Sequence, residues 1–533
     1  MADHRCAESS LPSPSARTRG PAAALPVLLA GLLSAALAAP ATAQLAPAEA
    51  TIFRLAVNED LALGSALVAG DFNGDGEQDL AMGAPLATNG GHASAGVVLL
   101  RYASGDVHFL MQSTSGLAVA EGGDQFGAAL AAGDLDCDGY DDLAVGIRWE
   151  DVGNALDTGA VLVYYGSAGG LPQAAGDLLL LDDVDTGNQN FAAFGFALAI
   201  LDYGTATELA VSAPGHDIPS AVSSGAVYVV PHTCPGGGFQ TASTLRLVQG
   251  VGGVVGMASD GDALGSALAA GDYNGDGRAD LAVGVPGNSY GGDEYGGIHV
   301  FYGAPGALAV AGNAVWYQDD PGVPGVAEDG DRFGAAVAAG DFDGDGFDDL
   351  AAGVPGEDVG ALADAGGVNV LYGSAAGLTG AGSQYFDQDT PGVTGVAEAL
   401  DHFGEALATG DFSGNGRADL AIGAPGENVG VFADAGTVNV FYGTGAGLSV
   451  VHNQGFTENE LPPPAAPANS EFFGGALAAI DLDGDGLVDL AAAAPYDRFN
   501  GFPVGLVAVV PGRPLFVDGF ESGDTARWSL TLP

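Results

Sequence analysis

The chain has 533 residues, with 67 aspartates and glutamates against 13 lysines and arginines, and a net charge of −54 near neutral pH. A protein this acidic repels other polyanions, which excludes binding to nucleic acid or to an anionic membrane through charge. The 89 glycines also mean that short glycine-containing motifs will occur by chance.

Residues 1–43 have the features of a secretory signal peptide. Two arginines precede an apolar stretch, residues 22–39, and the small residues 41–43 form a cleavage site before Gln44. A membrane anchor is the alternative, but the apolar stretch is short and contains Pro26. We therefore expect a secreted or cell-surface protein, extracellular or periplasmic, that is not inserted in a membrane.

An acidic sequence, Asp-x-Asp/Asn-x-Asp-Gly-x-x-Asp, recurs along the rest of the chain. Successive copies are 63 to 70 residues apart and begin at Asp71, Asp134, Asp202, Asp272, Asp341, Asp411 and Asp481. The copy at Asp202 is degenerate, with too few oxygen ligands, and we expect it to bind nothing. A fixed period of this length indicates a repeat architecture.

The other six copies have the composition of a calcium-binding loop. Side chains at positions one, three, five and nine offer oxygen atoms, and position seven can offer its backbone carbonyl. Calcium takes 6–8 hard oxygen ligands, whereas magnesium keeps its waters and rarely uses an all-protein cage. An EF-hand is excluded, since its last acid stands at position twelve between helices. The remaining alternative is a solvated acidic turn.

We predict about six calcium sites, one in each of these loops. Position seven acts through its carbonyl, and the predicted ligands are Asp71, Asn73, Asp75, Glu77, Asp79, Asp134, Asp136, Asp138, Tyr140, Asp142, Asp272, Asn274, Asp276, Arg278, Asp280, Asp341, Asp343, Asp345, Phe347, Asp349, Asp411, Ser413, Asn415, Arg417, Asp419, Asp481, Asp483, Asp485, Leu487 and Asp489. The loop at Asp411 has only two carboxylates, because Ser413 and Asn415 replace the others. We expect it to be the weakest site, since ligand charge tunes affinity.

Each repeat also contains four short apolar runs bounded by glycine and proline, which are typical of buried strands. Four strands per repeat of about 70 residues describe a propeller blade. We predict an all-β fold, a seven-bladed β-propeller over residues 44–513, with blades starting near residues 63, 126, 194, 264, 333, 403 and 473. A lone fourth-strand pattern at residues 51–57 and a final third strand at residues 505–510 predict that the N-terminal strand closes the ring. Residues 514–533 form a C-terminal tail.

Phe-Gly starts such as Phe126-Gly127, the acidic loops, and ends such as Gly423-Ala424-Pro425 resemble FG-GAP repeats. Seven of them resemble the N-terminal propeller of integrin alpha subunits and its secreted bacterial relatives, over residues 51–512. The resemblance implies calcium on one face of the propeller and ligand contacts on the other. It therefore implies a secreted adhesion or ligand-binding module in which calcium is structural.

The face opposite the acidic loops is formed by connections between second and third strands, such as residues 287–295. Trp149, Tyr290 and Tyr295 are candidate anchors there, because aromatic residues dominate binding hot spots. Packing between blades is the alternative for each of them. We expect an extracellular protein or glycan ligand, and a monomeric chain.

Two cysteines remain after removal of the signal peptide, Cys137 in the second acidic loop and Cys234 after the third strand of blade three. Both are expected on the same face of neighbouring blades. A disulfide requires an oxidising compartment and suitable geometry, so the sequence leaves their pairing open.

We predict no catalytic site. Gly287-Asn288-Ser289-Tyr290-Gly291 matches Gly-x-Ser-x-Gly, but the helix that follows the nucleophile in a hydrolase is not indicated. A carboxylate pair for glycosidic chemistry is still compatible with so many acids. FG-GAP propellers also occur in glycosylphosphatidylinositol phospholipases. The catalytic domains of those enzymes lie outside the propeller, and we recognise no such catalytic domain in this sequence. The alternative function is thus a hydrolase or lyase acting on extracellular polysaccharide or lipid-linked glycan.

Overall fold

The computed structural model describes residues 43–55, 59–185, 190–204, 206–290, 293–463 and 465–514. All of these belong to one compact unit, Ala41–Pro533. The predicted signal peptide and nearly all of the predicted C-terminal tail lie outside the described residues.

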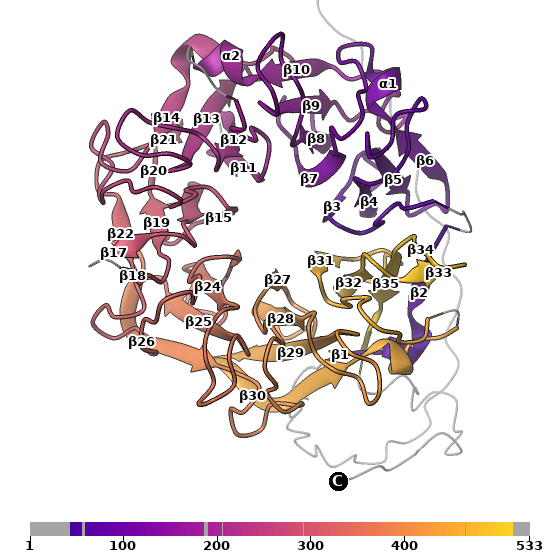
Figure 1. Cartoon of the computed structure of the whole chain (residues 1–533), viewed down its shortest axis with the longest axis vertical. Helices are drawn as coiled ribbons and strands as arrows, with labels where there is room; N and C mark the ends of the chain where they lie inside the picture. The colour runs from indigo at the N-terminus through magenta and orange to yellow at the C-terminus, as the bar shows by residue number, and fades with distance from the viewer. Residues whose placement is uncertain are drawn as a thin grey trace, which may run out of the picture. The chain divides into compact units, whose positions relative to one another are not determined.

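Seven four-stranded antiparallel sheets are arranged around a ring in the described residues (Figure 1). The first three blades contain β3 (Leu67–Gly70), β4 (Asp79–Ala84), β5 (Val97–Arg101) and β6 (Val107–Leu110); β7 (Phe126–Gly133), β8 (Asp142–Ile147), β9 (Ala160–Tyr164) and β10 (Asp177–Leu180); and β11 (Leu198–Asp202), β12 (Thr207–Ala213), β13 (Ala226–His232) and β14 (Leu245–Leu247). The next three contain β15 (Ala267–Gly271), β16 (Asp280–Gly284), β19 (Ile298–Phe301) and β22 (Ala314–Trp316); β23 (Val337–Gly340), β24 (Asp349–Val354), β25 (Gly367–Tyr372) and β26 (Thr379–Phe386); and β27 (Ala406–Gly410), β28 (Asp419–Ala424), β29 (Thr437–Thr444) and β30 (Gly447–Phe456). The predicted all-β, seven-bladed propeller is confirmed.

The last blade combines both ends of the described chain. Its strands are β31 (Ala476–Ile480), β32 (Asp489–Ala494), β35 (Leu506–Val510) and β2 (Thr51–Phe53). The indigo strand β2 lies beside the yellow strand β35 in Figure 1, with Thr51 opposite Val509 in antiparallel register. Closure of the ring by the N-terminal strand is therefore confirmed.

A second contact that the sequence did not predict reinforces the closure. Strand β1 (Ala43–Leu45) pairs with β36 (Gly512–Pro514). The side chain of Gln454 in blade six forms two hydrogen bonds with the backbone of Leu45. The Leu45 N–H donates to the Gln454 amide oxygen at 3.0 Å, and the Gln454 amide nitrogen donates to the Leu45 carbonyl at 3.1 Å. The N-terminal segment thus joins blade six to blade seven.

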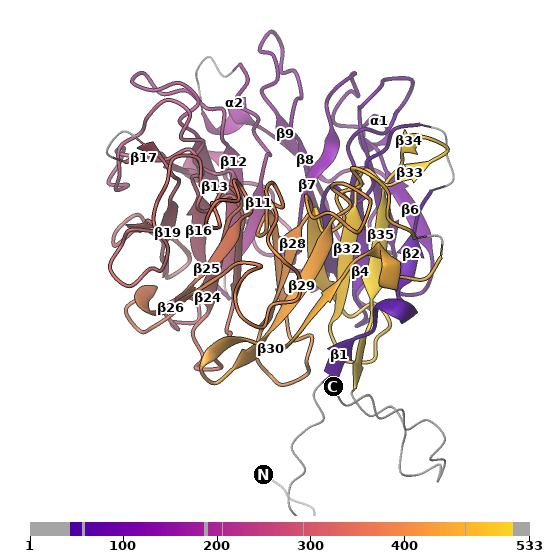
Figure 2. The same ribbon diagram turned by 60° about the horizontal axis from the view of Figure 1, so that its bottom comes forward.

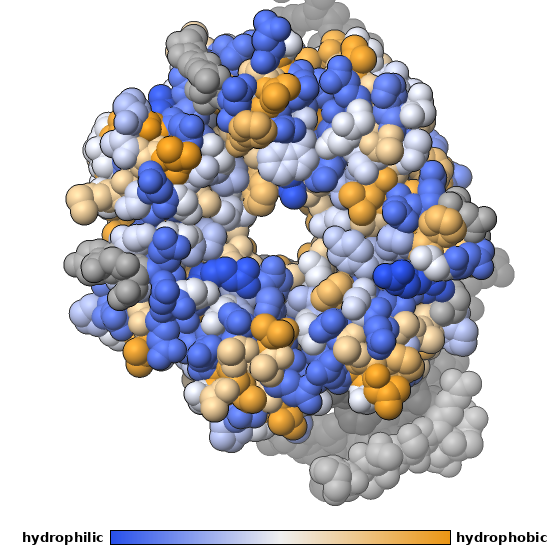
Figure 3. Space-filling model, viewed as in Figure 1, coloured by the Kyte–Doolittle hydropathy of each residue, from blue (hydrophilic) through white to orange (hydrophobic). Residues whose placement is uncertain are grey.

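The remaining described elements are short. They are the helices α1 (Gln112–Ser115), α2 (Leu181–Val184), η1 (Pro47–Glu49), η2 (Thr241–Ser243) and η3 (Glu458–Glu460), and the hairpins β17 (Ser289–Tyr290) with β18 (Asp293–Glu294), β20 (Gly303–Ala304) with β21 (Ala307–Leu308), and β33 (Arg498–Phe499) with β34 (Phe502–Pro503). In Figure 2 the β33–β34 hairpin lies at the upper end of the ring and β1 at the lower end. A space-filling view along the ring axis shows a central opening (Figure 3).

The hydrophobic core lies between adjacent blades. One cluster joins Ile298 and Val300 of blade four to Leu350 and Ala352 of blade five, and every residue of β24 is buried. Glycine permits the blades to approach near the axis. A Cβ on Gly353 would lie 2.0 Å from the carbonyl oxygen of Gly404 in the next blade. This contact explains why the Phe-Gly and Gly-Ala-Pro glycines recur together in the repeat.

Candidate metal-binding loops

Each acidic loop joins the first and second strands of a blade, at the end of the ring where β1 lies. Gly512 of β36, the partner of β1, donates its N–H to the position-nine Asp489 at 2.9 Å. The connections between second and third strands, including β33–β34, lie at the opposite end (Figure 2). The acidic loops and the connections between second and third strands therefore lie on opposite faces of the propeller, as the sequence predicted.

The position-one aspartate shapes the loop. In blade five the Oδ1 atom of Asp341 accepts the N–H groups of Gly344 and Asp345 at 2.7 and 3.1 Å, and its Oδ2 atom accepts that of Gly346 at 3.0 Å. Asp side chains form such turns with the backbone that follows them. The backbone is thereby bent around one carboxylate.

The position-nine aspartate lies deepest and is at most 1% exposed in all six loops. The Oδ2 atom of Asp349 accepts the Phe342 N–H at 2.9 Å, and its Oδ1 atom accepts the Gly373 N–H at 2.8 Å from the turn after the third strand. Burial outweighs these bonds and, with the nearby charges of Asp343 and Asp341, raises the pKa of Asp349 to about 7. A cation near this carboxylate would offset the cost of its burial.

Positions one, three and nine come together in three loops. Their carboxylate oxygens lie within 4.8 Å of one another in the groups Asp134, Asp136 and Asp142; Asp341, Asp343 and Asp349; and Asp481, Asp483 and Asp489. These groups could hold a metal ion. The position-five carboxylate is not part of them; that of Asp345 accepts the Phe347 N–H at 3.1 Å. Coordination by positions five and seven stays a prediction.

In the three loops with fewer carboxylates, position three is an asparagine or a serine instead of an aspartate. Asn274 donates its amide to both oxygens of Asp280 at 3.2 Å, and Asn73 donates to Asp79 at 3.4 Å. In the loop at Asp411, the Ser413 hydroxyl lies 3.4 Å from both Asp411 and Asp419. Positions three and nine therefore contact each other in these loops as well, and position one joins them in the loop at Asp411, with less negative charge in each case.

Blade three lacks the loop geometry. Buried Glu208 takes the place of the position-nine aspartate, and its Oε2 atom accepts the Tyr203 hydroxyl at 2.8 Å and the Leu308 N–H at 3.0 Å. These two donors use an oxygen that a metal would otherwise need. No cluster of three metal-ligating side chains includes Asp202 among the residues the structure describes.

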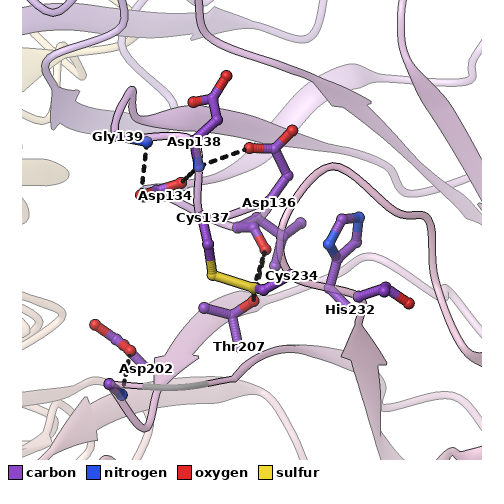
Figure 4. Close-up of a disulfide and its surroundings, with 12 residues drawn as sticks. Asp134, Asp136, Cys137, Asp138, Gly139, Asp202, Thr207, His232 and Cys234 are labelled. Carbon is purple, nitrogen blue, oxygen red and sulfur yellow. Dashed lines mark hydrogen bonds between the residues drawn. A yellow bond between two sulfur atoms is a disulfide. The ribbon is translucent and has the colours of Figure 1, made fainter. Parts of the chain in front are cut away.

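A disulfide connects the second acidic loop to this divergent blade. Cys137 and Cys234 are bonded with a Cα–Cα distance of 5.3 Å, which resolves the pairing that the sequence left open (Figure 4). The Thr207 hydroxyl beside the disulfide donates to the Leu135 carbonyl at 2.5 Å, across the same seam. The loop at Asp134 is thus attached to blade three by covalent and hydrogen bonds.

Position eight was missed by sequence reasoning, although it links neighbouring loops. Asp348 accepts the N–H of Asp272, the first residue of the preceding loop, at 2.8 Å, and Asp141 accepts that of Asp71 at 2.8 Å. Gln78 makes the same contact to Asp481 at 2.9 Å across the ring closure. The signal was the Asp-Asp doublet at positions eight and nine.

On the opposite face, the three candidate anchors differ. Tyr295 is 7% exposed and packs edge-on against Tyr317 of its own blade, with ring centroids 6.2 Å apart. Its side chain therefore has a packing role, through a contact within its own blade. The side chain of Tyr290 lies outside the described residues. Ser289 and Tyr290 belong to the β17–β18 hairpin, which is unlike the strand-to-helix turn of a hydrolase nucleophile.

Trp149 is the anchor candidate that borders a hollow, of 330 Å³. The hollow is lined by Trp149 and Phe191 together with Glu121, Gly122, Gly123, Asp124, Asp151 and Asp157. Phe191 is 57% exposed. Aromatic surface surrounded by carboxylates suits a ligand with positive charge or with many hydroxyl groups.

Comparison with known proteins supports the repeat assignment. The fold and its recurring loop define a β-propeller, and a family model described as FG-GAP repeat matches residues 63–100, 126–164, 264–301, 333–371, 403–441 and 473–510. The chain therefore contains six FG-GAP repeats, and its propeller resembles that of integrin alpha subunits. The third blade, with its degenerate loop, falls between the matches.

Three relatives are similar over part of the chain. Phosphatidylinositol-glycan-specific phospholipase D of Rattus norvegicus is 32% identical over 34% of this chain and 21% of its own length. Integrin alpha-PS5 of Drosophila melanogaster is 36% identical over 31% of this chain and 15% of its own. Integrin alpha-PS2 of the same species is 30% identical over 44% of this chain and 15% of its own. The match thus covers about a fifth or less of each relative.

Within the described part of the chain, no helix is long and apolar enough to span a bilayer.

Proposed function

We propose that this chain is an exported, calcium-stabilised propeller that acts as an adhesion or ligand-binding module. The observation that carries the proposal is the convergence of the carboxylates at positions one, three and nine, whose oxygens lie within 4.8 Å of one another in the three acidic loops with most carboxylates. Carboxylates so close repel one another unless a cation lies between them. Hard oxygen donors in this number favour calcium, with the position-seven carbonyl and water completing the coordination.

The role of calcium would be structural. Each loop is joined to the turn of its own blade through position nine and, in several seams, to the loop of the preceding blade through position eight. An ion that fixes the loop therefore also fixes two blades relative to each other. The disulfide supports export, because disulfides persist in oxidising compartments.

The calcium proposal is tested by counting ions bound per chain with mass spectrometry. Removing two carboxylates from the blade-five loop, with Asp341→Asn and Asp345→Asn, should lower the count by one and lower the melting temperature in calcium. The difference from the wild type should shrink in excess chelator. Asp202→Asn, in the degenerate loop, is the matched control and should change neither. An unchanged ion count in the blade-five variant would contradict the proposal.

Ligand binding is proposed for the face opposite the loops, with the hollow beside Trp149 as a contact site and an extracellular glycan or protein as ligand. A hydrolase or lyase is the second candidate, favoured by the similarity to the rat phospholipase D. A glycan array followed by product analysis separates the two. Retention of an intact glycan, weakened by Trp149→Ala, supports a binding module, whereas release of product supports an enzyme.

A further inference from the structure

The seams between blades contain a recurring polar group on the face opposite the acidic loops. A glutamine after the fourth strand of one blade donates its amide to a glutamate after the second strand of the next, in the pairs Gln112–Glu150, Gln318–Glu357 and Gln388–Glu427. The Gln318 bond measures 2.7 Å. An aspartate two residues before the Phe-Gly start of that next blade, such as Asp331, lies nearby, and burial together with the negative charge of the glutamate raises its pKa. Each of these seams combines two carboxyl groups with one amide donor.

The seam between blades six and seven departs from this pattern. Glu458, in η3, stands where the other seams have glutamine, and it meets Glu471 and Asp497 with carboxylate oxygens within 4.8 Å of one another. The three side chains are only 1%, 2% and 1% exposed. A carboxylate cannot donate a hydrogen bond, and neither oxygen of Glu458 accepts one from a side chain; the backbone N–H of Ala466 is its donor. The donor of the other seams is missing here.

Charge balance at this seam is incomplete. Arg54, which follows the closing strand β2, forms an ion pair with Asp497. Three ionised carboxylates and one guanidinium leave a charge of −2 in a site that is closed to solvent. Burying uncompensated charge is costly, and buried charges in proteins are paired or coordinate metals.

We propose that Glu458, Glu471 and Asp497 bind a hard divalent cation, calcium or magnesium, at the closure seam of the ring. One such ion neutralises the remaining charge and supplies the positively charged partner that Glu458 lacks. The three carboxylates offer only oxygen atoms as ligands, and softer transition metals prefer nitrogen or sulfur ligands. The site therefore favours calcium or magnesium. The site is distinct from the acidic loops, since it lies at the opposite face and uses none of their residues.

Protonation is the competing explanation. Burial and the charges of Glu471 and Asp497 raise the pKa of Glu458 to about 8. Two retained protons would also reduce the charge, without any metal. The two explanations differ in the number of ions bound per chain, which can be measured directly.

A cation here would act on ring closure. Glu458 follows the last strand of blade six, Glu471 and Asp497 flank the first two strands of blade seven, and Arg54 follows β2. The ion would thus join blade six to the blade that holds the N-terminal strand. It would complement β1 and Gln454, which make the same connection at the other face.

The test uses Glu458→Gln, which restores the residue type of the other seams and should therefore fold. After equilibration with calcium, and separately with magnesium, ions per chain are counted by mass spectrometry. We expect one ion fewer than in the wild type with at least one of the two metals. Glu427→Gln, which neutralises a carboxylate at a seam that keeps its glutamine, is the matched control and should leave the count unchanged.

Equal counts in wild type and Glu458→Gln with both metals would overturn the inference and assign the cluster to protons. Crystals of the wild type soaked in Mn²⁺ give an independent result: an anomalous peak among the three carboxylates supports the site, and none there refutes it. Neither result depends on the acidic loops. If the loops bound nothing, the wild type would still hold one ion more than the variant.

Discussion

At the residue scale, the contact between Gly353 and the carbonyl of Gly404 sets how closely two blades approach. The substitution Gly353→Ala places a Cβ 2.0 Å from that backbone oxygen, which has no flexible side chain to move aside. We expect the variant to lose about 3 kcal/mol of stability, at the upper end for overpacking. Urea unfolding in calcium measures the loss.

Gly169→Ala is the control for that substitution. The nearest atom to its added Cβ is the Ser167 hydroxyl at 3.8 Å, which is ordinary contact. It should unfold within about 0.5 kcal/mol of the wild type, as surface substitutions usually do. If both alanine variants were equally stable, the seam would be looser than the structure indicates.

Residues that act within one repeat could be predicted from the sequence, whereas residues that act between repeats could not. Positions one, three and nine are separated by at most eight residues, so their spacing alone predicted that they would meet. Asp348 contacts Asp272, 76 positions away, and only the ring geometry brings them together. The same holds for Glu458, whose partners belong to the next blade.

At the element scale, pairing with a segment that is distant in sequence determines whether a short stretch of the chain forms a strand. The pattern at residues 51–57 was long enough to be recognised as a missing fourth strand. The structure shows it as Thr51–Phe53, and adds β1, whose three residues have no pattern of their own. Strand β1 exists because β36 offers an edge to it, and a sequence cannot show that edge.

The disulfide compensates at this scale for a blade without a complete acidic loop. Replacing both cysteines, with Cys137→Ser and Cys234→Ser, should cost about 2–4 kcal/mol, because the bond closes a chain segment with a sequence separation of 97 residues. Thermal melts in calcium measure the effect. Reductant should lower the melting temperature of the wild type toward that of the double variant and leave the variant unchanged. A wild type that is insensitive to complete reduction would contradict this role.

At the scale of the whole molecule, stability depends on how a net charge of −54 is tolerated. Much of this charge lies on exposed residues, where salt screens it beyond about 10 Å at 0.1 M. Buried carboxyl groups at the blade seams respond differently. Burial, followed by the charges around each group, raises the pKa of Glu357 from 4.5 to about 7 and that of Asp331 from 3.8 to about 7.

These raised pKa values predict that the calcium-free protein loses stability as pH rises. Between the unfolded pKa near 4 and the folded pKa near 7, the folded chain binds more protons than the unfolded chain. Stability is therefore greatest below that range and is lost as pH rises through about 7. We expect the melting temperature in chelator to fall from pH 5 to pH 8.

The variant Glu357→Gln separates two contributions to the pH dependence of stability: the ionisation of buried carboxyl groups between blades, and the repulsion among exposed charges. Glutamine cannot ionise, so the variant should lose about 2 kcal/mol less than the wild type over this range. High salt should reduce the part of the slope that comes from surface repulsion in both proteins, because it screens exposed charges. The difference between the two slopes should persist in salt, since buried groups are screened much less. Parallel slopes at every salt concentration would mean that the seam carboxyls keep ordinary pKa values, and that the pH response belongs to the surface alone.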